Sequence, residues 1–283
     1  MIAAIDSERN DKQTYAMRQM LKTMCRGDSF SIPRLGTREQ VMVISPVDLY
    51  GHWGRVLRTS PINLFYVGSG EPERVADSLR GTFGGMKREY EIVSPQVPFY
   101  PGDPQDVVET MEIAQGKLCM GFTTPITNRD PRFAAMQVMN TILGAGMTSK
   151  LFSVVREKMS LCYNIGSGYY STKGIVIVSA GIDFDKEQQT KDEILHQLDL
   201  CARGEISDLE MKAAKQALYS SLRATNDSPG AIESFYSTAV LSGLKMDTNA
   251  YMLAIGRVTR EQVAEAAGTL KLNTTYFLKG GSK

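Results

Sequence analysis

An arginine and a tyrosine stand seven residues apart in the segment 149-SKLFSVVREKMSLCYNIGSGYYS-171. The apolar residues around Arg156 repeat at helical spacing, and those around Tyr163 alternate, so a helix should run directly into a strand. Because little chain separates the two elements, the guanidinium and the phenol can converge and donate hydrogen bonds to a peptide carbonyl or a developing oxyanion. The alternative is an arginine in a surface ion pair with Glu157 or a nearby aspartate, and a tyrosine packed in the core.

Other chemistries have little support in the sequence. A catalytic zinc site needs three protein ligands, commonly including two histidines on one helical turn, but His52 and His196 are the two histidines of the chain and lie far apart in it. The run GAGMTSK departs from a phosphate-binding loop at Ser149 and Leu151, and no G-x-S-x-G motif is present. The sequence therefore predicts neither a metal site nor a catalytic residue within this chain.

The composition restricts the possible partners and compartment. With 283 residues, 42% of them hydrophobic, the chain can bury a sizeable core, and its net charge of +1 gives no reason to expect a nucleic-acid surface. No run of 18 apolar residues is present, and the N-terminus has charges where a signal peptide needs its apolar region. Four widely spaced cysteines without a C-x-x-C pair are typical of buried, reduced thiols. We expect a cytoplasmic protein that binds neither nucleic acid nor membrane.

Helices and strands follow one another in mixed runs, which favours an α+β fold over a regular parallel array. Apolar spacing and capping residues predict helices near 10–26, 45–58, 72–84, 131–143, 148–159, 186–203, 206–225, 230–243, 247–255 and 259–268. Short apolar runs predict strands near 62–70, 109–125, 160–170, 174–182 and 274–280. Residues 86–108 contain four prolines without a sustained period, so we expect a linker there.

The chain also repeats itself at long range. The segment 44–68 parallels 258–280: in both, an aliphatic residue and a hydroxyl cap precede a helix, a loop follows, and a short strand ends in glycine. These features predict that residues 1–85 are the C-terminal remnant of a first copy and that 109–283 form a complete second copy. The first copy would then lack its front, about 100 residues or more.

The opening segment resembles a known family. The run 140-NTILGAGMTSKLFSVVREKMSLCYNIGSGY-169 is similar to the C-terminal half of the pitrilysin/insulinase family of zinc metallopeptidases, which shows a glycine-rich corner and then S-x-L-F-x-x-[VI]-R-E-K-x-[SG]-L-x-Y. The resemblance implies two similar α+β domains, each with an antiparallel or mixed sheet covered by helices on one face. It also implies that Arg156 and Tyr163 bind substrate backbone and support the tetrahedral intermediate.

The same resemblance places the metal elsewhere. The family holds zinc with H-x-x-E-H and a more distant glutamate. This chain has no H-x-x-E-H motif, and by the resemblance it begins just beyond the distant glutamate, so Glu8 is not expected to replace that ligand. Zinc is therefore expected only in a domain absent from this chain or in a partner. The chain looks most like bacterial members that lack zinc ligands or work beside an active partner.

These observations lead to three hypotheses. In the first, the chain is the non-catalytic C-terminal part of a pitrilysin-like peptidase, forms one wall of a peptide-binding chamber, and supports proteolysis only with an H-x-x-E-H domain or subunit in a homo- or heterodimer. In the second, it is a catalytically inactive peptide-binding or regulatory subunit of an active homologue. In the third, it is a structural domain in which Arg156 and Tyr163 only pack.

Overall fold

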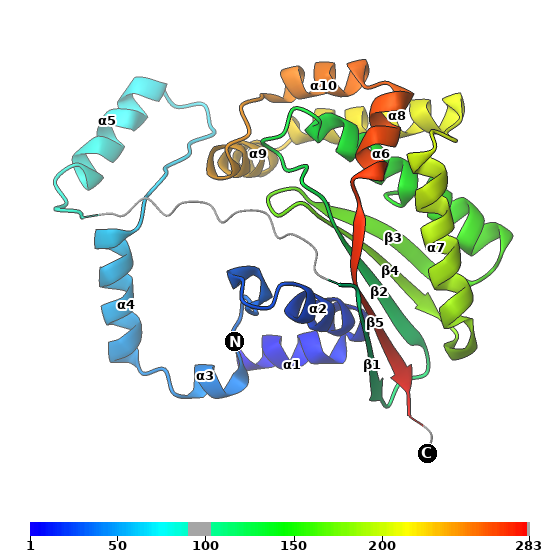
Figure 1. Ribbon diagram of the computed structural model, residues 1–283. Helices are drawn as coiled ribbons and strands as arrows, with labels where there is room; N and C mark the ends of the chain where they lie inside the picture. The colour runs from blue at the N-terminus through cyan, green and yellow to red at the C-terminus, as the bar shows by residue number, and fades with distance from the viewer. Residues whose placement is uncertain (90–102, 282–283) are drawn as a thin grey trace.

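A five-stranded sheet organises the chain in the computed structural model, which describes residues 1–89 and 103–281 (Figure 1). The strands lie in the order β1-β5-β2-β4-β3. Only β1 and β5 are parallel, and the other neighbours are antiparallel. Their bounds are β1 Gln105–Met111, β2 Gly116–Thr123, β3 Cys162–Tyr170, β4 Ile175–Ile182 and β5 Lys271–Gly280. The predicted α+β fold with a mixed sheet is confirmed.

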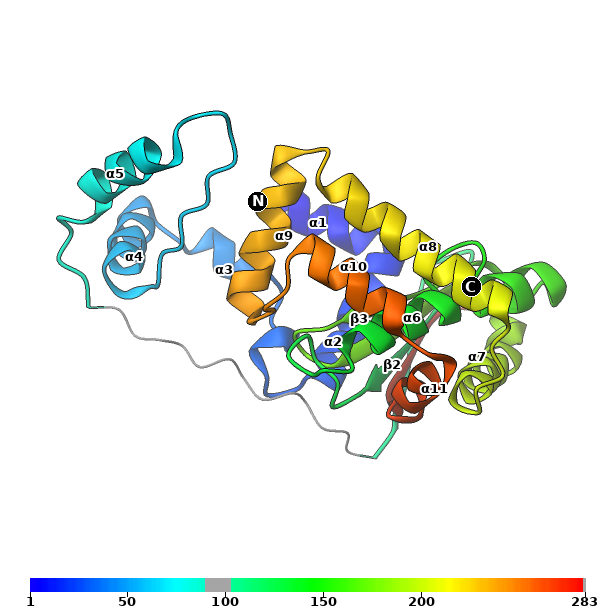
Figure 2. The same ribbon diagram turned by 90° about the horizontal axis from the view of Figure 1, so that it is seen from above.

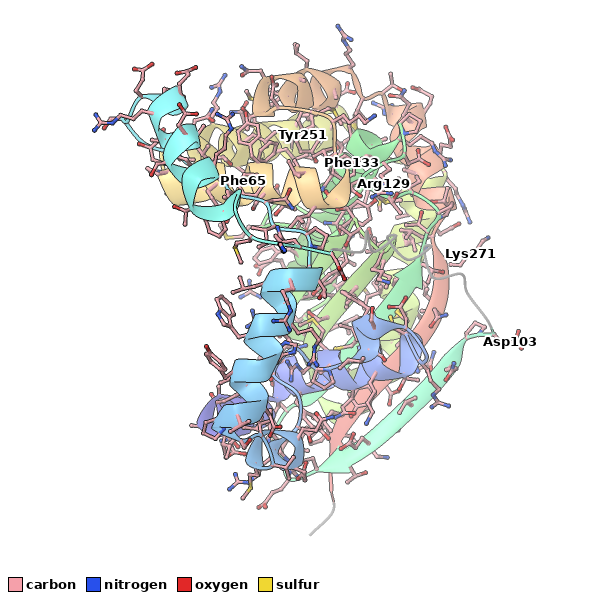
Figure 3. All side chains as sticks on the ribbon, turned by 90° about the vertical axis from the view of Figure 1, so that its left-hand side faces the viewer. Phe65, Asp103, Arg129, Phe133, Tyr251 and Lys271 are labelled. Carbon is pink, nitrogen blue, oxygen red and sulfur yellow. The ribbon has the colours of Figure 1, made fainter. Side chains whose placement is uncertain are left out.

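One face of this sheet is covered by the helices of the C-terminal part (Figure 1). They are α6 Phe133–Leu143, the π-helix η2 Leu151–Lys158, the short η3 Phe184–Lys186, α7 Glu187–Ala202, α8 Asp208–Thr225, α9 Pro229–Ser242, α10 Thr248–Arg257 and α11 Arg260–Gly268. The rings of Phe133 and Tyr251 stack with centroids 5.3 Å apart, joining α6 to α10 (Figure 3). This layer holds η2, and with it Arg156, against the end of β3.

The other face is covered by the N-terminal helix that was predicted near residues 10–26, although its position on the sheet was not predicted. Helix α2, Lys12–Met24, begins at the Asp11 cap and buries Ala16, Met20 and Met24 against β2, β4 and β5. A Cβ at Gly121 of β2 would lie 2.6 Å from the Met24 sulfur, so the close approach of helix and strand requires glycine there. Helix α1, Ile2–Asn10, and the short η1, Ser29–Ser31, pack on α2.

Three further helices lie apart from the sheet: α3 Arg38–Met42, α4 Pro46–Thr59 and α5 Pro72–Phe83 (Figure 2). None of their residues is buried. The prediction of a buried strand at 62–70 is wrong for the described structure, in which these residues belong to no strand and Leu64 and Tyr66 are 47% and 48% exposed. A strand needs neighbours for its backbone hydrogen bonds, and no described strand pairs with this segment.

The predicted strand 109–125 is instead two strands, β1 and β2. Since β1 runs parallel to β5 and β2 antiparallel to it, the chain must reverse between them. Residues 112–115, where it does so, contain no glycine, proline, asparagine or aspartate to indicate a turn. Strand β1 begins within the expected linker 86–108, of which residues 90–102 lie outside the described structure. The division into a remnant and a complete copy remains a prediction.

All four cysteines are buried, and none forms a disulfide. Within residues 1–89 and 103–281, no helix combines the length and apolar content needed to cross a bilayer.

Candidate functional site

Arg156 lies at the margin of η2, as its position in the sequence predicted. Leu151 and Val155 of this helix are buried, which leaves the Arg156 side chain 38% exposed. Its guanidinium carbon lies 4.6 Å from the centroid of the Phe152 ring, and its Nη1 lies 3.5 Å from Oε1 of Glu157. The ring orients the cation, and the exposed ion pair adds little, so the guanidinium can exchange Glu157 for another acceptor.

Tyr163 is directed outward by a bulge at the start of β3. The pairing with β4 shifts between Cys162 and Asn164, so Tyr163 is an extra residue in its strand. Strict alternation would put Leu161 and Tyr163 on the same face, but Leu161 and Cys162 are both buried while Tyr163 is 60% exposed. Bulges redirect side chains in this way. The alternative of a tyrosine packed in the core is therefore wrong, whereas the ion pair to Glu157 that it assumed is present.

A carboxylate and an ammonium hold the phenol in place. The Tyr163 hydroxyl donates to Oδ1 of Asp183 over 2.8 Å, and Nζ of Lys186 lies 3.1 Å from Oδ2 of the same carboxylate. Lys186 also donates to the carbonyl of Ser160 over 3.1 Å. Ser160 has a φ of 52°, a left-handed conformation that is uncommon outside glycine. These bonds tie η2, β3 and η3 together at one point.

The same contacts shift the acidities of the three groups. The hydrogen bond to Asp183 raises the pKa of Tyr163 above its ordinary value. The pKa of Asp183 is lowered by the hydrogen bonds from Tyr163 and from Lys186, and the hydrogen bond to Asp183 raises the pKa of Lys186. At neutral pH the group is thus a neutral phenol, a carboxylate and an ammonium.

Arg156 and Tyr163 line one cavity of about 390 Å³, so the structure brings the two predicted residues together. Asp183 and Lys186 also line it, and sequence reasoning missed both; the only signal was a charged pair three residues apart just after an apolar strand. The cavity contains hydrogen-bond donors and acceptors but no activated nucleophile, because burial raises the pKa of the Cys162 thiol to about 11. It can bind polar backbone, and the role of the pair remains a prediction.

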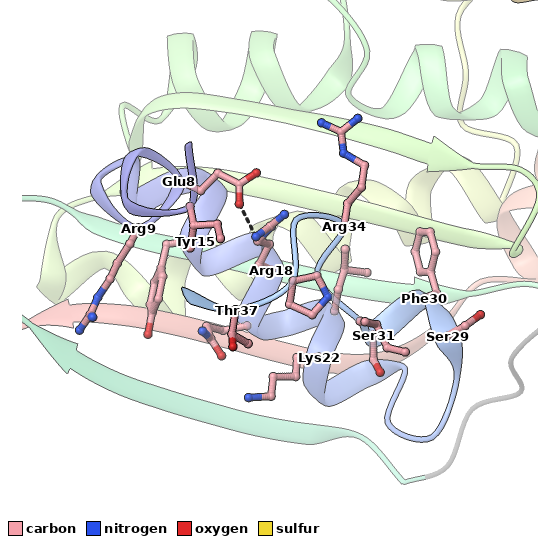
Figure 4. Close-up of a pocket in the computed structure, with 15 residues that line it drawn as sticks. Glu8, Arg9, Tyr15, Arg18, Lys22, Ser29, Phe30, Ser31, Arg34 and Thr37 are labelled. Carbon is pink, nitrogen blue, oxygen red and sulfur yellow. Dashed lines mark ion pairs between the residues drawn. The ribbon is translucent and has the colours of Figure 1, made fainter. Parts of the chain in front are cut away.

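A larger cavity, of about 470 Å³, lies between α1, α2 and residues 29–37 (Figure 4). Arg9, Lys22 and Arg34 line it, together with an ion pair between Glu8 and Arg18. Glu8 therefore serves as the partner of an arginine. The lining is otherwise largely apolar.

The residues present do not fit a zinc site. In the part of the chain that the structure describes, no group of three or more His, Cys, Asp or Glu side chains could hold a metal ion. His52 lies exposed on α4 with Nδ1 3.1 Å from the Arg55 guanidinium, and His196 lies exposed on α7.

Comparison with known proteins identifies the family. The family model described as the peptidase M16 inactive domain matches residues 44–218. The Bacillus subtilis protein YmfF, described as a probable inactive metalloprotease, is 27% identical over 271 residues, which are 96% of this chain and 64% of that protein. The chain thus spans less than two thirds of this relative.

Solved structures agree with the family model. A conserved protein from Enterococcus faecalis superposes with a TM-score of 0.91 at 25% identity, covering 99% of this chain and 67% of that one. A chain of Complex III2 from Candida albicans shares the fold, with a TM-score of 0.73 at 18% identity over 99% of this chain and 69% of its own. The fold therefore also occurs as a subunit of a larger assembly. The resemblance to the pitrilysin/insulinase peptidases is confirmed: the chain belongs to the peptidase M16 inactive-domain family.

Proposed function

We propose that this chain is the non-catalytic C-terminal part of an M16-type peptidase and forms one wall of a peptide-binding chamber. Zinc and the H-x-x-E-H motif would come from another domain or subunit. The observation that carries this proposal is the cavity at which Arg156 and Tyr163 meet, lined by donors and acceptors but by no metal ligand set and no activated nucleophile.

Arg156 and Tyr163 would bind different groups of the peptide backbone. The Arg156 guanidinium, held only by an exposed ion pair, donates to a substrate carbonyl or to the oxyanion that develops from it. Tyr163 donates its hydroxyl hydrogen bond to Asp183 in the resting state, so its oxygen is the atom that first accepts from a peptide N–H. Rotation of the phenol away from Asp183 would let it donate instead, and Lys186 would then balance the released carboxylate.

The position of β3 at the sheet edge supports binding of an extended peptide. In the sheet order, β3 has a strand on one side only. Near its centre the free edge is already used, since the N–H of Ser167 donates to the carbonyl of Gly144 over 3.0 Å. The stretch next to Tyr163 is therefore the part of this edge where a peptide strand would add, with main-chain bonds and little sequence preference.

The second hypothesis, an inactive peptide-binding or regulatory subunit, remains the alternative. Its support is the same lack of metal ligands in the described residues, together with the description of the Bacillus subtilis relative as probably inactive. Under this alternative the chain binds peptide through the same cavity but never contributes to cleavage.

The test is a cleavage assay with an H-x-x-E-H-bearing family protein, zinc and an unstructured peptide. We expect cleavage only in the mixture, and a loss of about 100-fold in kcat/KM for Arg156→Ala, the size seen when one oxyanion donor is removed. Tyr163→Phe should also lower kcat/KM. Arg203→Ala, which removes an exposed arginine paired with Asp199 on α7, is the matched control and should change nothing.

Two results would contradict the proposal. Chelator-sensitive cleavage by the chain alone would show a metal site within it. Cleavage in the mixture that is unaffected by Arg156→Ala and Tyr163→Phe would remove their role. Peptide binding that depends on Arg156 without any cleavage would favour the inactive subunit.

A further inference from the structure

The helix that carries Arg156 ends differently from the other helices of its layer. After η2, the N–H of Leu161 donates over 3.0 Å to the carbonyl of Val155, which lies six residues back. After α7, the N–H of Glu205 donates to the carbonyl of Leu200, which lies five residues back, as at an ordinary helix end. The longer reach follows from the π-helical geometry of η2, a rare form that is found mostly at functional sites.

A serine occupies the left-handed position of this ending. Helices α7 and α9 are followed by Gly204 and Gly243, with φ of 75° and 77°, because glycine has no Cβ to clash there. Helix η2 is followed by Ser160 with a φ of 52°, and within residues 1–89 and 103–281 no other residue besides glycine has a positive φ. A residue with a side chain disfavours this conformation about tenfold. A contact from elsewhere in the fold must therefore hold Ser160 in place.

That contact comes from Lys186 of η3. Its Nζ donates to the carbonyl of Ser160 over 3.1 Å and lies 3.1 Å from Oδ2 of Asp183. The Ser160 side chain is exposed and forms no hydrogen bond with the residues that the structure describes, so it does not hold its own backbone. The left-handed conformation at the end of η2 is thus maintained from a segment more than twenty residues further along the chain.

The conformation of Ser160 affects both residues of the candidate site. Its N–H donates to the carbonyl of Arg156 over 3.1 Å, and Tyr163 follows three residues later at the bulge of β3. A right-handed or extended Ser160 would release the Arg156 carbonyl and change the direction of the chain before β3 begins. The cavity that Arg156 and Tyr163 line together therefore depends on the conformation of Ser160.

We propose that Lys186 is a positioning residue for the peptide site. Its ammonium holds the left-handed Ser160 on one side and, on the other, the Asp183 carboxylate to which Tyr163 donates. Arg156 and Tyr163 then face one peptide together, and Lys186 acts through these neighbours. That Arg156 and Tyr163 bind a peptide rests on the proposed function. The coupling of Lys186 to Ser160 rests on the geometry alone.

An ammonium fits this role better than a neutral group. It carries three N–H donors, so one lysine can bind the Ser160 carbonyl and the Asp183 carboxylate at once. Its bond to the carboxylate is charge-assisted, which anchors the end of the side chain beside the carbonyl. Because the need for Lys186 comes from the side chain at position 160, the two positions are interdependent. With glycine at 160, the lysine would be needed much less.

The first test is a rescue experiment that needs no peptide. Lys186→Met keeps the length of the side chain but removes its donors, so protection of the amides of residues 160 and 161 against hydrogen exchange should fall about tenfold. Adding Ser160→Gly should restore protection to within about threefold of the native value, because glycine adopts the left-handed conformation freely. Lys186→Arg, which keeps the charge and the donors, should stay close to the native value.

The matched control is Lys191→Met on α7. Lys191 lies 3.2 Å from Glu187 and 3.4 Å from Asp106, so its loss removes the same charge and two carboxylate contacts without touching Ser160. Protection at residues 160 and 161 should be unchanged in this control. An equal loss in the control, or a loss in Lys186→Met that Ser160→Gly does not rescue, would overturn the proposal.

The second test uses the cleavage assay with the H-x-x-E-H-bearing family protein. Lys186→Met should lower kcat/KM about tenfold, mainly through kcat, because a displaced donor is lost chiefly in the transition state. Adding Ser160→Gly should recover most of this loss, and Lys191→Met should cause none. If the double variant regains amide protection but not kcat, Lys186 acts on the peptide directly and is not a positioning residue.

These outcomes are separable from those that test the proposed function. Rescue of amide protection, with no cleavage by any mixture, would leave the coupling of Lys186 to Ser160 standing and remove the proposed function. Arg156-dependent cleavage that Lys186→Met leaves intact would do the reverse.

Discussion

Replacing Met20 by alanine tests whether α2 holds the second face of the sheet. Met20 is fully buried, and the opposing strand carries Gly121, which has no side chain to fill a gap. The substitution removes three heavy atoms from an apolar site, and their burial contributes about 2.4 kcal/mol to the free energy of unfolding, at ~0.8 kcal/mol each. Since the flat sheet surface cannot close over the space, a cavity term adds to this. We expect the free energy of unfolding to fall by about 3 kcal/mol, within the usual range for Met→Ala in a core.

The assay is urea unfolding followed by far-UV circular dichroism, with amide exchange of β2 and β5 recorded in parallel. Met147→Ala is the control, because Met147 is 79% exposed and its loss should cost no more than about 0.5 kcal/mol. The m-value should be unchanged in both variants. A loss below about 1 kcal/mol for Met20→Ala, with exchange in β2 and β5 unaltered, would refute the packing of α2 on the sheet.

The remaining predictions concern titrating groups. Asp183→Asn should bring the pKa of Tyr163 down toward its ordinary value in an alkaline ultraviolet titration, with Tyr163→Phe identifying the signal; an unchanged midpoint would exclude the hydrogen bond. Burial raises the pKa of Cys162 from 9.0 to about 11, so the thiolate fraction should be about 100-fold lower in the native protein than in the unfolded protein. Alkylation of Cys162 at neutral pH should therefore be much faster in urea, which mass spectrometry of its peptide can measure. Burial opposes ionisation of Asp28, but hydrogen bonds from Lys173 and the backbone dominate and lower its pKa. The contribution of Asp28 to the free energy of unfolding is therefore present at neutral pH and is lost as the pH falls below about 4. Asp28→Asn should lower the free energy of unfolding by about 1–3 kcal/mol at neutral pH and make it less dependent on pH in acid.

Much of the local structure was predictable because its causes are local. The helices predicted near 45–58 and 206–225 are present, and each begins with a capping box, formed by Ser45 with Asp48 and by Ser207 with Glu210. The partners of such a cap lie within one turn, so the sequence contains the whole interaction. The same holds for the helix-to-strand junction that brings Arg156 close to Tyr163.

The rest of the site depended on contacts that no short segment contains. The bulge that turns Tyr163 outward arises from its pairing with β4, and the carboxylate that holds the phenol comes from Asp183, twenty residues further along the chain. Neither hydrophobic period nor spacing encodes a register shift. The outward orientation of Tyr163 therefore depends on tertiary contacts, whereas its proximity to Arg156 follows from the local sequence.

The segment 62–70 shows most clearly what the local sequence cannot predict. Its composition is that of a buried strand, as in β5, but in the described structure it is exposed and unpaired. By itself the sequence determined the apolar pattern, the caps and the repeat. Only the tertiary structure decided which apolar faces are covered, with α2 buried under the sheet and residues 62–70 exposed. The physical reason is that a strand and an amphipathic helix each carry half of an interface, and burial requires the other half.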